Sequence, residues 1–530
     1  MKVLVAEKIA DEGIEKLRAE GYDVDVIDGR REEDLIATIP GYDALIVCSD
    51  APATEAVMEA GRNLKVIGRA GIGLGNVDVR SATEHGIIVC NAPTSIVMSA
   101  AEQTFALILA VTRHIPQANA AMHEGRWEHA RFVGSELYGK TLAIFGLGRI
   151  GALVADRAHA FEMEVIAYDP YCPPERAQQL GVTLCGTVEE ACATADIITA
   201  HLPKTAETVR MFGAEQYALM KDGVYLINNA CGDIFDLDAM VPFLENGHIA
   251  GLGLDVYEPE PCTASPVHRF ENVILTPHIG ASTYEARNRA GVQIAQYVTD
   301  GLRGRMVPTA VNVAPVPAET IDTVGPYIPA CETLGHIIAQ MADADFTALD
   351  LCVYGDLATQ DVTVLATAAL GGIFSEEGDP ANLVNAAYIA EQRGMTINIS
   401  GSPLSPDYSS MADLTARMGK DEIEIACTVS GNSLQTRIVS IDGYKLDFVP
   451  GSNFMVLVYE DRPGRLGQIG TIMGDAGINI ETLELSDAKK NGKTDNRALV
   501  AFNVDGPVPD EIKERLGRAV DLAEGYFIDL

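Results

Sequence analysis

The stretch from Thr141 to Gly151 constrains this chain more than any other part of it. The apolar run Thr141–Phe145 leads directly into a Gly-x-Gly-x-x-Gly spacing at Gly146, Gly148 and Gly151. This order predicts a strand, a tight turn and a helix whose free N–H groups face a phosphate. Gly146 permits the turn, Gly148 lets the backbone approach a pyrophosphate, and Gly151 lets helix and strand pack closely. We therefore expect a dinucleotide to bind here.

The next predicted strand indicates which dinucleotide. Residues 164–168 form a short apolar pattern that ends at Asp169, eighteen residues beyond Gly151. An acid at this spacing accepts hydrogen bonds from ribose hydroxyls and repels an additional 2′-phosphate, so we expect NAD and not NADP. Glycines alone would only shape a turn in a parallel sheet, but the complete succession of strand, turn, helix, strand and acid favours a cofactor site.

A chain of 530 residues is too long for one core, since single domains usually run to about 100–200 residues. Strands and amphipathic helices alternate through residues 3–90, and more strands are expected at 197–200, 224–227, 249–254 and 273–275, which predicts doubly wound α/β units. Two long helices, 100–113 and 283–301, flank the second unit. If the later helix returns to the first unit, residues 1–98 and 284–315 form one discontinuous domain around an NAD-binding domain of residues 99–283.

The remainder of the chain divides at a proline-rich linker near Pro315 and Pro317. Residues 316–450 form an intervening domain that ends in strands near 423–429 and 437–441. Residues 451–530 follow the order strand, helix, strand, strand, helix, strand, which predicts a ferredoxin-like unit. We expect this last unit to sense a ligand or to support assembly.

Composition excludes several classes of function. The formal net charge is −36, so the long-range field of the protein repels nucleic acids and anionic membranes. Ten cysteines without Cys-x-x-Cys spacing indicate reduced thiols and no structural metal. No stretch reaches the roughly 18 apolar residues of a membrane span, and we expect a cytoplasmic protein.

Loops that follow the later strands carry further polar motifs. Together with Gly146–Gly151, these motifs resemble those of the NAD-dependent, D-isomer-specific 2-hydroxyacid dehydrogenases over residues 1–315. The motifs are Asn91-Ala-Pro-Thr94, Gly139-Lys-Thr141, His201-Leu-Pro-Lys-Thr205, Asn229-Ala-Cys-Gly-Asp233, Asp255-Val-Tyr-Glu-Pro-Glu260 and Thr276-Pro-His278-Ile-Gly280. The four-part layout, with Asp461-Arg-Pro-Gly464 opening an ACT domain, is similar to the long-form D-3-phosphoglycerate dehydrogenases, the branch that begins serine synthesis.

The resemblance implies a catalytic pair. His278 corresponds to a general base that takes the hydroxyl proton while a hydride leaves the same carbon, and an imidazole suits that task near neutral pH. Glu260 is expected to orient His278 and to stabilise its imidazolium form. Cofactor contacts are implied for Arg149, Ile150, Pro203, Thr205, Asp255 and Gly280, and substrate contacts for Ser49, Arg69 and Arg131.

This chain departs from the family pattern on the substrate side. Cys231 stands where the family places an arginine that binds the substrate carboxylate, and the loss of such a contact costs on the order of 3 kcal/mol. Cys48 precedes Ser49 where an arginine is usual, and His129 replaces a basic residue. Smaller departures are Gly75 and Ile96. Two alternatives therefore stay open: the same chemistry on another acid such as 2-oxoglutarate, or a weakly catalytic NAD-binding amino-acid sensor.

The resemblance also suggests regulation. Asp461 from one chain and Asn479 from another would bind a small amino acid such as L-serine across a subunit boundary, with Tyr459 closing the pocket. Capping of a helix by Asp461 and of a turn by Asn479 would explain the same residues without a ligand. Long-form relatives suggest a homotetramer.

Overall fold

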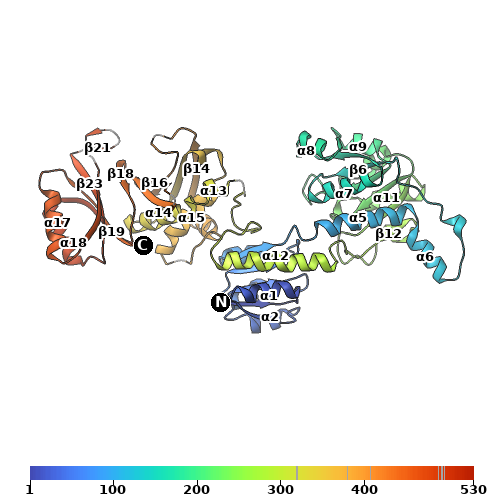
Figure 1. The fold of residues 1–530 in the computed structure, drawn as a ribbon, viewed down its shortest axis with the longest axis horizontal. Coiled ribbons are helices and arrows are strands. Elements are labelled where there is room, and N and C mark those ends of the chain that lie inside the picture. Colours follow the sequence, from blue (N-terminus) through green and yellow to red (C-terminus); the bar gives the residue numbers. More distant parts are fainter. Residues whose placement is uncertain are drawn as a thin grey trace.

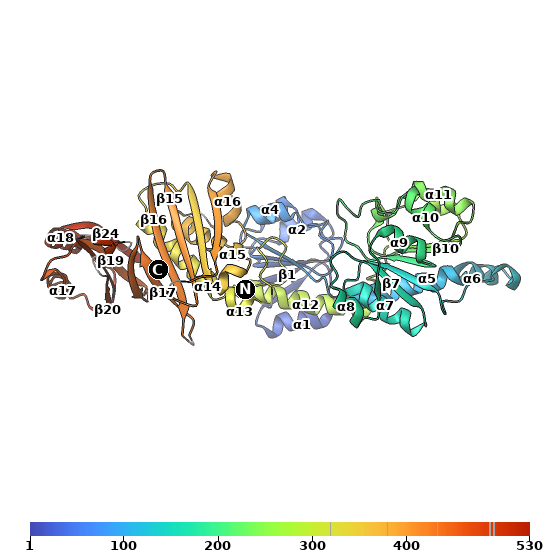
Figure 2. The same ribbon diagram turned by 90° about the horizontal axis from the view of Figure 1, so that it is seen from above.

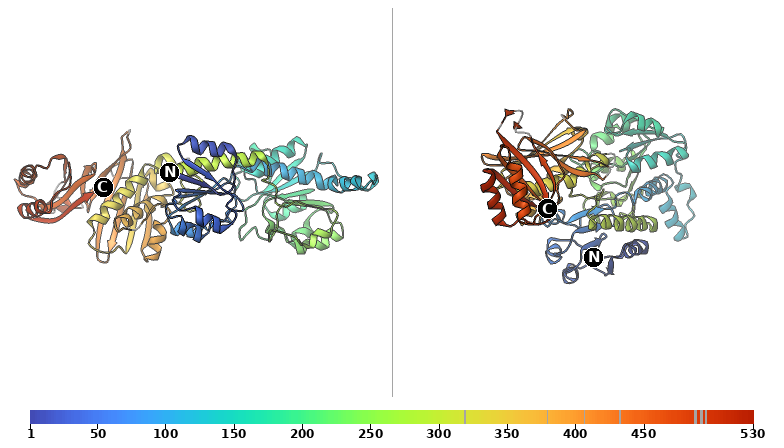
Figure 3. Two further views of the ribbon diagram at one scale, coloured as in Figure 1. Left: turned by 90° about the horizontal axis from the view of Figure 1, so that it is seen from below. Right: turned by 60° about the vertical axis from the view of Figure 1, so that its left-hand side comes forward.

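The computed structural model describes residues 1–317, 320–378, 380–405, 407–431, 433–486, 489–490, 493–494 and 496–530. Four units, each built on its own sheet, lie along the long axis of the molecule, with the first unit between the second and the third and the fourth at the end beyond the third (Figures 1 and 2). The N-terminus lies in one of the two central units, and the C-terminus lies where the last two units meet (Figure 3).

The first unit is a five-stranded parallel sheet in the order β2-β1-β3-β4-β5. Its strands are β1 Lys2–Val5, β2 Asp23–Val26, β3 Ala44–Val47, β4 Val66–Arg69 and β5 Ile88–Asn91, and its helices are α1 Asp11–Ala19, α2 Glu32–Thr38, α3 Glu55–Ala60 and α4 Val79–Glu84. Separate apolar clusters cover its two faces, so its strands are buried on both sides as a parallel sheet requires.

Helix α12, Tyr284–Leu302, follows the last strand of the second unit and returns to this first sheet (Figure 1). Ile294 and Val298 lie against Gly68 of β4, where a Cβ atom would come within 3 Å of both side chains. Gly13 of α1 and Gly291 of α12 let the two helices cross closely, because a Cβ on Gly13 would lie 2.6 Å from the Gly291 carbonyl oxygen. The chain therefore leaves the first unit after β5 and re-enters it through α12.

The second unit is a seven-stranded parallel sheet in the order β12-β11-β10-β9-β6-β7-β8. Its strands are β6 Thr141–Phe145, β7 Glu164–Tyr168, β8 Thr183–Leu184, β9 Ile197–Ala200, β10 Val224–Asn228, β11 Ile249–Leu254 and β12 Val273–Leu275. Its helices are α5 Val97–Thr112, α6 Ile115–His123, η1 His129–Arg131, α7 Arg149–Ala160, α8 Pro174–Gln179, α9 Val188–Thr194, α10 Ala214–Leu219, η2 Gly232–Ile234, α11 Leu237–Glu245 and η3 Pro266–Arg269. The strand order reverses between β6 and β9, and ligands of open α/β sheets bind at such a reversal.

The third unit is a six-stranded sheet in the order β14-β13-β15-β16-β17-β18, with β13 and β14 parallel and the remaining pairs antiparallel. Its strands are β13 Ala348–Gly355, β14 Thr396–Ser402, β15 Ser410–Met418, β16 Asp421–Ser430, β17 Gln435–Ile441 and β18 Tyr444–Phe448. Its helices are α13 Ile321–Val324, α14 Tyr327–Met341, η4 Asp356–Thr359, α15 Thr363–Glu376 and α16 Ala386–Gln392. The core of this unit lies between the sheet and helices α14 and α15.

The fourth unit is an antiparallel sheet in the order β20-β23-β19-β24 with two helices. Its elements are β19 Asn453–Glu460, α17 Arg465–Asp475, β20 Ile480–Leu485, β23 Arg497–Val504, α18 Asp510–Val520 and β24 Leu522–Asp529, with a small hairpin of β21 Lys489–Lys490 and β22 Lys493–Thr494. Phe454 and Ile528 share a core with Phe448 of the third unit, and Gln340 makes two hydrogen bonds with the backbone of Asp529. The third and fourth units therefore pack as neighbours.

The predicted fold class is confirmed, from the doubly wound sheets to the ferredoxin-like end of the chain. The six strands expected between residues 141 and 275 lie within one residue of those observed, and the fourth unit has the expected order of strands and helices. Strands β8, β13, β14, β15, β18, β21 and β22 were not among the expected elements. In the part of the chain that the structure describes, no helix combines the length and the apolar character needed to cross a bilayer.

Candidate active site

His278 and Glu260 meet at the carboxyl edge of the second sheet. The His278 Nδ1 atom lies 2.8 Å from Glu260 Oε2, and the other carboxylate oxygen accepts a 2.9 Å hydrogen bond from the Tyr257 N–H. About 57% of the His278 side chain is exposed, so its Nε2 atom remains accessible to a ligand. The two residues that the motifs singled out as a pair are thus in contact, eighteen positions apart in sequence.

Asp255 holds the turn that carries His278. This fully buried carboxylate accepts hydrogen bonds from the Thr276 hydroxyl at 2.5 Å, the Ile279 N–H at 2.9 Å and the Gly280 N–H at 2.7 Å. Gly280 must lack a side chain, because a Cβ atom there would meet both Asp255 and Asn229. Asp255 therefore faces the backbone of the loop and positions His278.

Asn229 was not predicted as a site residue, although its motif was recognised. Its side-chain amide donates a 2.9 Å hydrogen bond to the Ala100 carbonyl of α5, and its oxygen lies against Gly280. Tyr257 was also missed: its hydroxyl donates to the Thr276 carbonyl at 2.9 Å. Asn229 and Tyr257 both belong to motifs that were recognised in the sequence. Their hydrogen-bond partners, however, are known only from the fold.

The glycine-rich turn forms a cradle with room for a phosphate. Gly146 has a φ of +94°, and a Cβ atom on Gly151 would collide with the Gly146 carbonyl. No atom lies within 4 Å of a Cβ built on Gly148, which caps the first turn of α7 without using a side chain. Arg149 and Ile150 begin that helix, so the free N–H groups of its first turn point into open space.

Asp169 ends β7 beside this turn. One carboxylate oxygen accepts from the Leu147 N–H at 2.8 Å and the other from the Tyr171 N–H at 3.0 Å. A carboxylate accepts about four hydrogen bonds, so capacity remains for two ribose hydroxyls. The residues present therefore fit NAD.

The loop that contains Pro203 and Thr205 is held by a residue that the sequence did not single out. The buried Thr208 hydroxyl donates to the Pro203 carbonyl at 2.6 Å and accepts from the Thr205 N–H at 2.8 Å. This loop follows β9, next to the glycine-rich turn after β6. Pro203 and Thr205 therefore lie at the same sheet edge as the glycine-rich turn.

Cys231 lies in the loop after β10 and is half-buried. Burial raises the pKa of its thiol, and the neighbouring Asp233 raises it further, so the thiol is neutral at physiological pH. Lys204 is the nearby cation, but its ammonium group lies 2.7 Å from Asp233 and 3.4 Å from Glu258. No positive charge at position 231 replaces the expected arginine.

The predicted substrate residues do not all come together. Ser49 follows β3 and Arg69 ends β4, so both lie at the carboxyl edge of the first sheet. Arg131 instead lies in η1, after α6 in the chain. It forms ion pairs with Glu271 at 2.6 Å and with Glu128 at 3.4 Å. In this chain Arg131 and His129 are parts of the second unit and are separate from the Ser49 and Arg69 pair.

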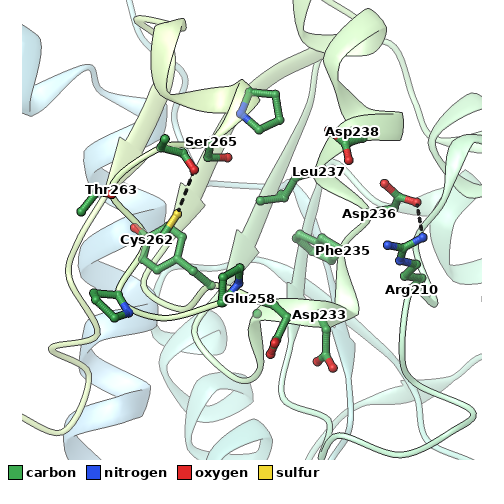
Figure 4. A pocket seen from close by; sticks show the side chains of 16 residues that line it. Arg210, Asp233, Phe235, Asp236, Leu237, Asp238, Glu258, Cys262, Thr263 and Ser265 are labelled. Atoms are coloured by element: carbon green, nitrogen blue, oxygen red, sulfur yellow. Dashed lines mark hydrogen bonds and ion pairs between the residues drawn. The ribbon is translucent and has the colours of Figure 1, made fainter.

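A pocket of about 340 Å³ lies between residues 232–238, which follow β10, and residues 257–266, which follow β11. Figure 4 shows the carboxylates of Asp233, Asp236 and Glu258 around it, with Arg210 held 3.8 Å from Asp236. Neither His278 nor Glu260 lines it. Its surplus of carboxylates disfavours an anionic ligand, so we place the candidate site at the sheet edges and not in this pocket.

In the fourth unit, Tyr459 is 2% exposed and packs in the hydrophobic core. Asp461 and Asn479 are exposed. Asp461 hydrogen-bonds to the backbone of Asn496 before β23, and Asn479 to that of Asp505 after it, so the two residues lie at opposite ends of that strand, about 30 Å apart. One chain alone does not hold a ligand between them.

Three segments of the chain match known protein families. Residues 105–280 match the NAD-binding domain of the D-isomer-specific 2-hydroxyacid dehydrogenases, residues 323–442 the D-3-phosphoglycerate dehydrogenase intervening domain, and residues 454–521 the ACT domain. The chain is 40% identical to D-3-phosphoglycerate dehydrogenase of Mycobacterium tuberculosis, over 100% of this chain and 99% of that one. It is 38% identical to the enzyme of the same name from Methanocaldococcus jannaschii, with complete coverage of both.

Solved structures resemble the first two units. The TT0316 protein of Thermus thermophilus is 33% identical with a TM-score of 0.53, covering 59% of this chain and all of that one. A glyoxylate reductase from Paecilomyes thermophila is 29% identical with a TM-score of 0.52, covering 59% of this chain and 98% of that one.

The role of Asp255 leads to a testable prediction. Asp255→Asn replaces an acceptor by an amide whose NH₂ group faces N–H donors, and we expect the free energy of unfolding to fall by about 1–3 kcal/mol. Urea unfolding measures this loss, and amide exchange at Ile279 and Gly280 should accelerate. Asp156→Asn, on the exposed face of α7, is the matched control. Equal stability of the two variants would contradict the assigned role.

Proposed function

The chain belongs to the D-isomer-specific 2-hydroxyacid dehydrogenases, in their D-3-phosphoglycerate dehydrogenase branch, and we propose that it oxidises D-3-phosphoglycerate to 3-phosphohydroxypyruvate. The chain is an NAD-dependent oxidoreductase. The proposed reaction is the first step of L-serine biosynthesis. The observation that carries the proposal is the contact between His278 and Glu260 at the sheet edge that also bears the glycine-rich turn.

The cofactor is NAD, which when bound accepts the hydride that leaves the substrate carbon. We assign its pyrophosphate to the N-terminal turn of α7, where Gly148, Arg149 and Ile150 expose backbone N–H groups. Asp169 is assigned to the ribose hydroxyls. The loop with Pro203 and Thr205 and the turn at Gly280 would border the cofactor, the latter fixed by Asp255.

His278 is assigned the role of general base. Because Nδ1 donates to the Glu260 carboxylate, the neutral ring keeps its lone pair on Nε2, the exposed nitrogen. Nε2 takes the hydroxyl proton of the substrate, and Glu260 stabilises the imidazolium that results. In the reverse direction the same imidazolium returns the proton to the keto oxygen.

Cys231 bears on the choice of substrate. A neutral thiol offers no bidentate contact to a carboxylate, so substrate binding must rely on other groups. This observation favours a second candidate function, which is the same chemistry on a 2-hydroxy acid other than phosphoglycerate.

We further propose that the chain assembles as a homotetramer in the cytoplasm and that its ACT domain binds L-serine. The opposite positions of Asp461 and Asn479 along β23 fit a ligand that bridges two chains. Because Tyr459 is buried, its role would be to support the strand beneath the ligand. The ten unpaired cysteines fit a reducing compartment.

The catalytic assignment is tested by NADH oxidation with a panel of 2-keto acids that includes 3-phosphohydroxypyruvate and 2-oxoglutarate. We expect the phosphorylated acid to be preferred and His278→Ala to lose at least about 100-fold in kcat while NADH still binds. Glu260→Gln should lose about tenfold, since an amide does not stabilise the imidazolium. His123→Ala, on the exposed surface of α6, serves as the control. Undiminished rates in both variants would reject the pair.

The substitution Cys231→Arg tests whether the substrate side retains family geometry. A guanidinium there would restore the bidentate contact to a carboxylate, and we expect kcat/KM for the preferred acid to rise at least about tenfold, or 1.4 kcal/mol. Steady-state kinetics measure the effect, with Cys231→Ser as the uncharged control. A fall in kcat/KM would mean that the site is built around the thiol.

The regulatory assignment is tested by calorimetric titration with L-serine. The wild-type protein should bind serine at micromolar to millimolar concentration, and Asn479→Ala should weaken binding by about 1–3 kcal/mol, because a buried polar group of the ligand loses its partner. Glycine and L-alanine serve as control ligands. Wild-type protein that binds none of these amino acids would leave the ACT domain as an assembly module.

A further inference from the structure

Cys48 stands where the family has an arginine before Ser49. Two other arginines, Arg69 and Arg287, lie near this position. Cys48 follows β3 and Arg69 ends β4, so the two side chains are neighbours at the carboxyl edge of the first sheet. Arg287 comes from the start of α12, more than two hundred residues later in the chain. The motifs gave it no role.

The packing of α12 directs Arg287 to this edge. Gly301 lies against Val66 at the start of β4, Ile294 lies against Gly68 near its end, and Gly291 lies against Ala10 beyond β1. The helix therefore runs antiparallel to β4, and its sheet-facing stripe continues from Gly291 to Arg287 four residues earlier. Seven residues separate Arg287 from Ile294, a rise of about 10 Å. Arg287 thus lies just past the carboxyl ends of the strands.

The electrostatics of Cys48 agree with this placement. Burial, Glu7 and Asp50 together raise the pKa of its thiol to about 11, whereas Arg69 and Arg287 both act in the opposite direction. Both guanidinium groups therefore lie within electrostatic reach of the same sulfur atom. Cys48 itself contributes no charge.

The two arginines have unused hydrogen-bonding capacity. The Arg69 Nε atom is buried without an acceptor, and Gly71 leaves the space that the Arg69 guanidinium occupies. Arg287 is exposed, and among the residues that the structure describes no hydrogen bond or ion pair engages its guanidinium. Arg289, two positions on, is committed to the Ser95 carbonyl at 2.9 Å.

The carboxylates nearby are already engaged. Glu7 accepts hydrogen bonds from the N–H groups of Cys48, Asp50 and Ala51 at 2.8 to 3.3 Å. Asp50 lies 3.7 Å from Arg30. Arg69 and Arg287 are therefore available to a ligand anion at this edge.

We propose that Arg287 takes the place of the arginine absent at position 48 and, together with Arg69, binds the phosphate of the substrate. Arg287 is nine residues after His278 on the same continuous segment, so the base and the anion contact are fixed relative to each other by the start of α12. Two arginines offer several N–H donors, and the oxygen atoms of a phosphate can accept hydrogen bonds from them. This role rests on the proposed function and assigns the determinant of its specificity.

The test compares 3-phosphohydroxypyruvate with hydroxypyruvate, the same keto acid without the phosphate. Arg287→Gln should lower kcat/KM for the phosphorylated acid at least tenfold, mainly through KM, and change that for hydroxypyruvate less than twofold. Adding Cys48→Arg to Arg287→Gln should restore most of the loss, because the charge returns from the other side of the same site. Arg303→Gln, at the far end of α12, is the control.

Direct binding separates this inference from the proposed reaction. In calorimetry with inorganic phosphate, wild-type protein should bind and Arg287→Gln should bind at least tenfold more weakly. Equal phosphate affinity of the two proteins, or equal loss on both keto acids, would overturn the role of Arg287. Wild-type protein that binds phosphate through Arg287 but turns over no phosphorylated keto acid would overturn the proposed reaction and leave this anion site standing.

Discussion

The site depends on the hydrogen bonds that the buried carboxylate of Asp255 accepts from the turn that carries His278. His278 has a φ of +52°, a left-handed conformation that costs a non-glycine residue about 1–2 kcal/mol. Three hydrogen bonds from the surrounding turn to Asp255 offset that cost. Strand register makes the arrangement possible, because Leu254 pairs with Leu275 and the ends of β11 and β12 therefore meet at one edge. Glu260 then reaches His278 from the loop after β11.

The same turn couples the chemistry to the first unit. Thr283 caps α12 by accepting from the Ala286 N–H, and its hydroxyl lies 2.8 Å from the Ser99 hydroxyl at the start of α5. The Arg289 contact with Ser95 ties the two crossing segments again. The two units are thus joined by a pair of segments that hold each other at the crossing. A substrate-binding residue at the start of α12 is therefore positioned by these contacts between the two crossing segments.

The sequence predicted most of the local structure because local patterns determine it. The strand before Gly146, the acid at Asp169 and the strands of the ferredoxin-like unit all follow from short apolar runs and turn residues. Contacts across long separations were not predictable: Arg287 lies 239 residues from Cys48, and nothing in the pattern of α12 says which turn passes the sheet edge. The burial of Tyr459 was not predictable from its motif either, because both faces of β19 are covered in the fold and Tyr459 packs in the core of the fourth unit.

Net charge and site charge act over different distances, and this difference resolves the conflict between an acidic protein and an anionic substrate. The net charge of −36 is spread over the surface and is screened beyond about 10 Å at 0.1 M salt. A unit charge pair 4 Å apart near a protein surface is worth about 4 kcal/mol. Arg69 and Arg287 act at that short range, and Glu7 nearby is occupied by backbone N–H groups. Substrate affinity therefore depends on two local guanidinium groups, whereas the surrounding field slows the approach of the anion, a penalty that added salt relieves.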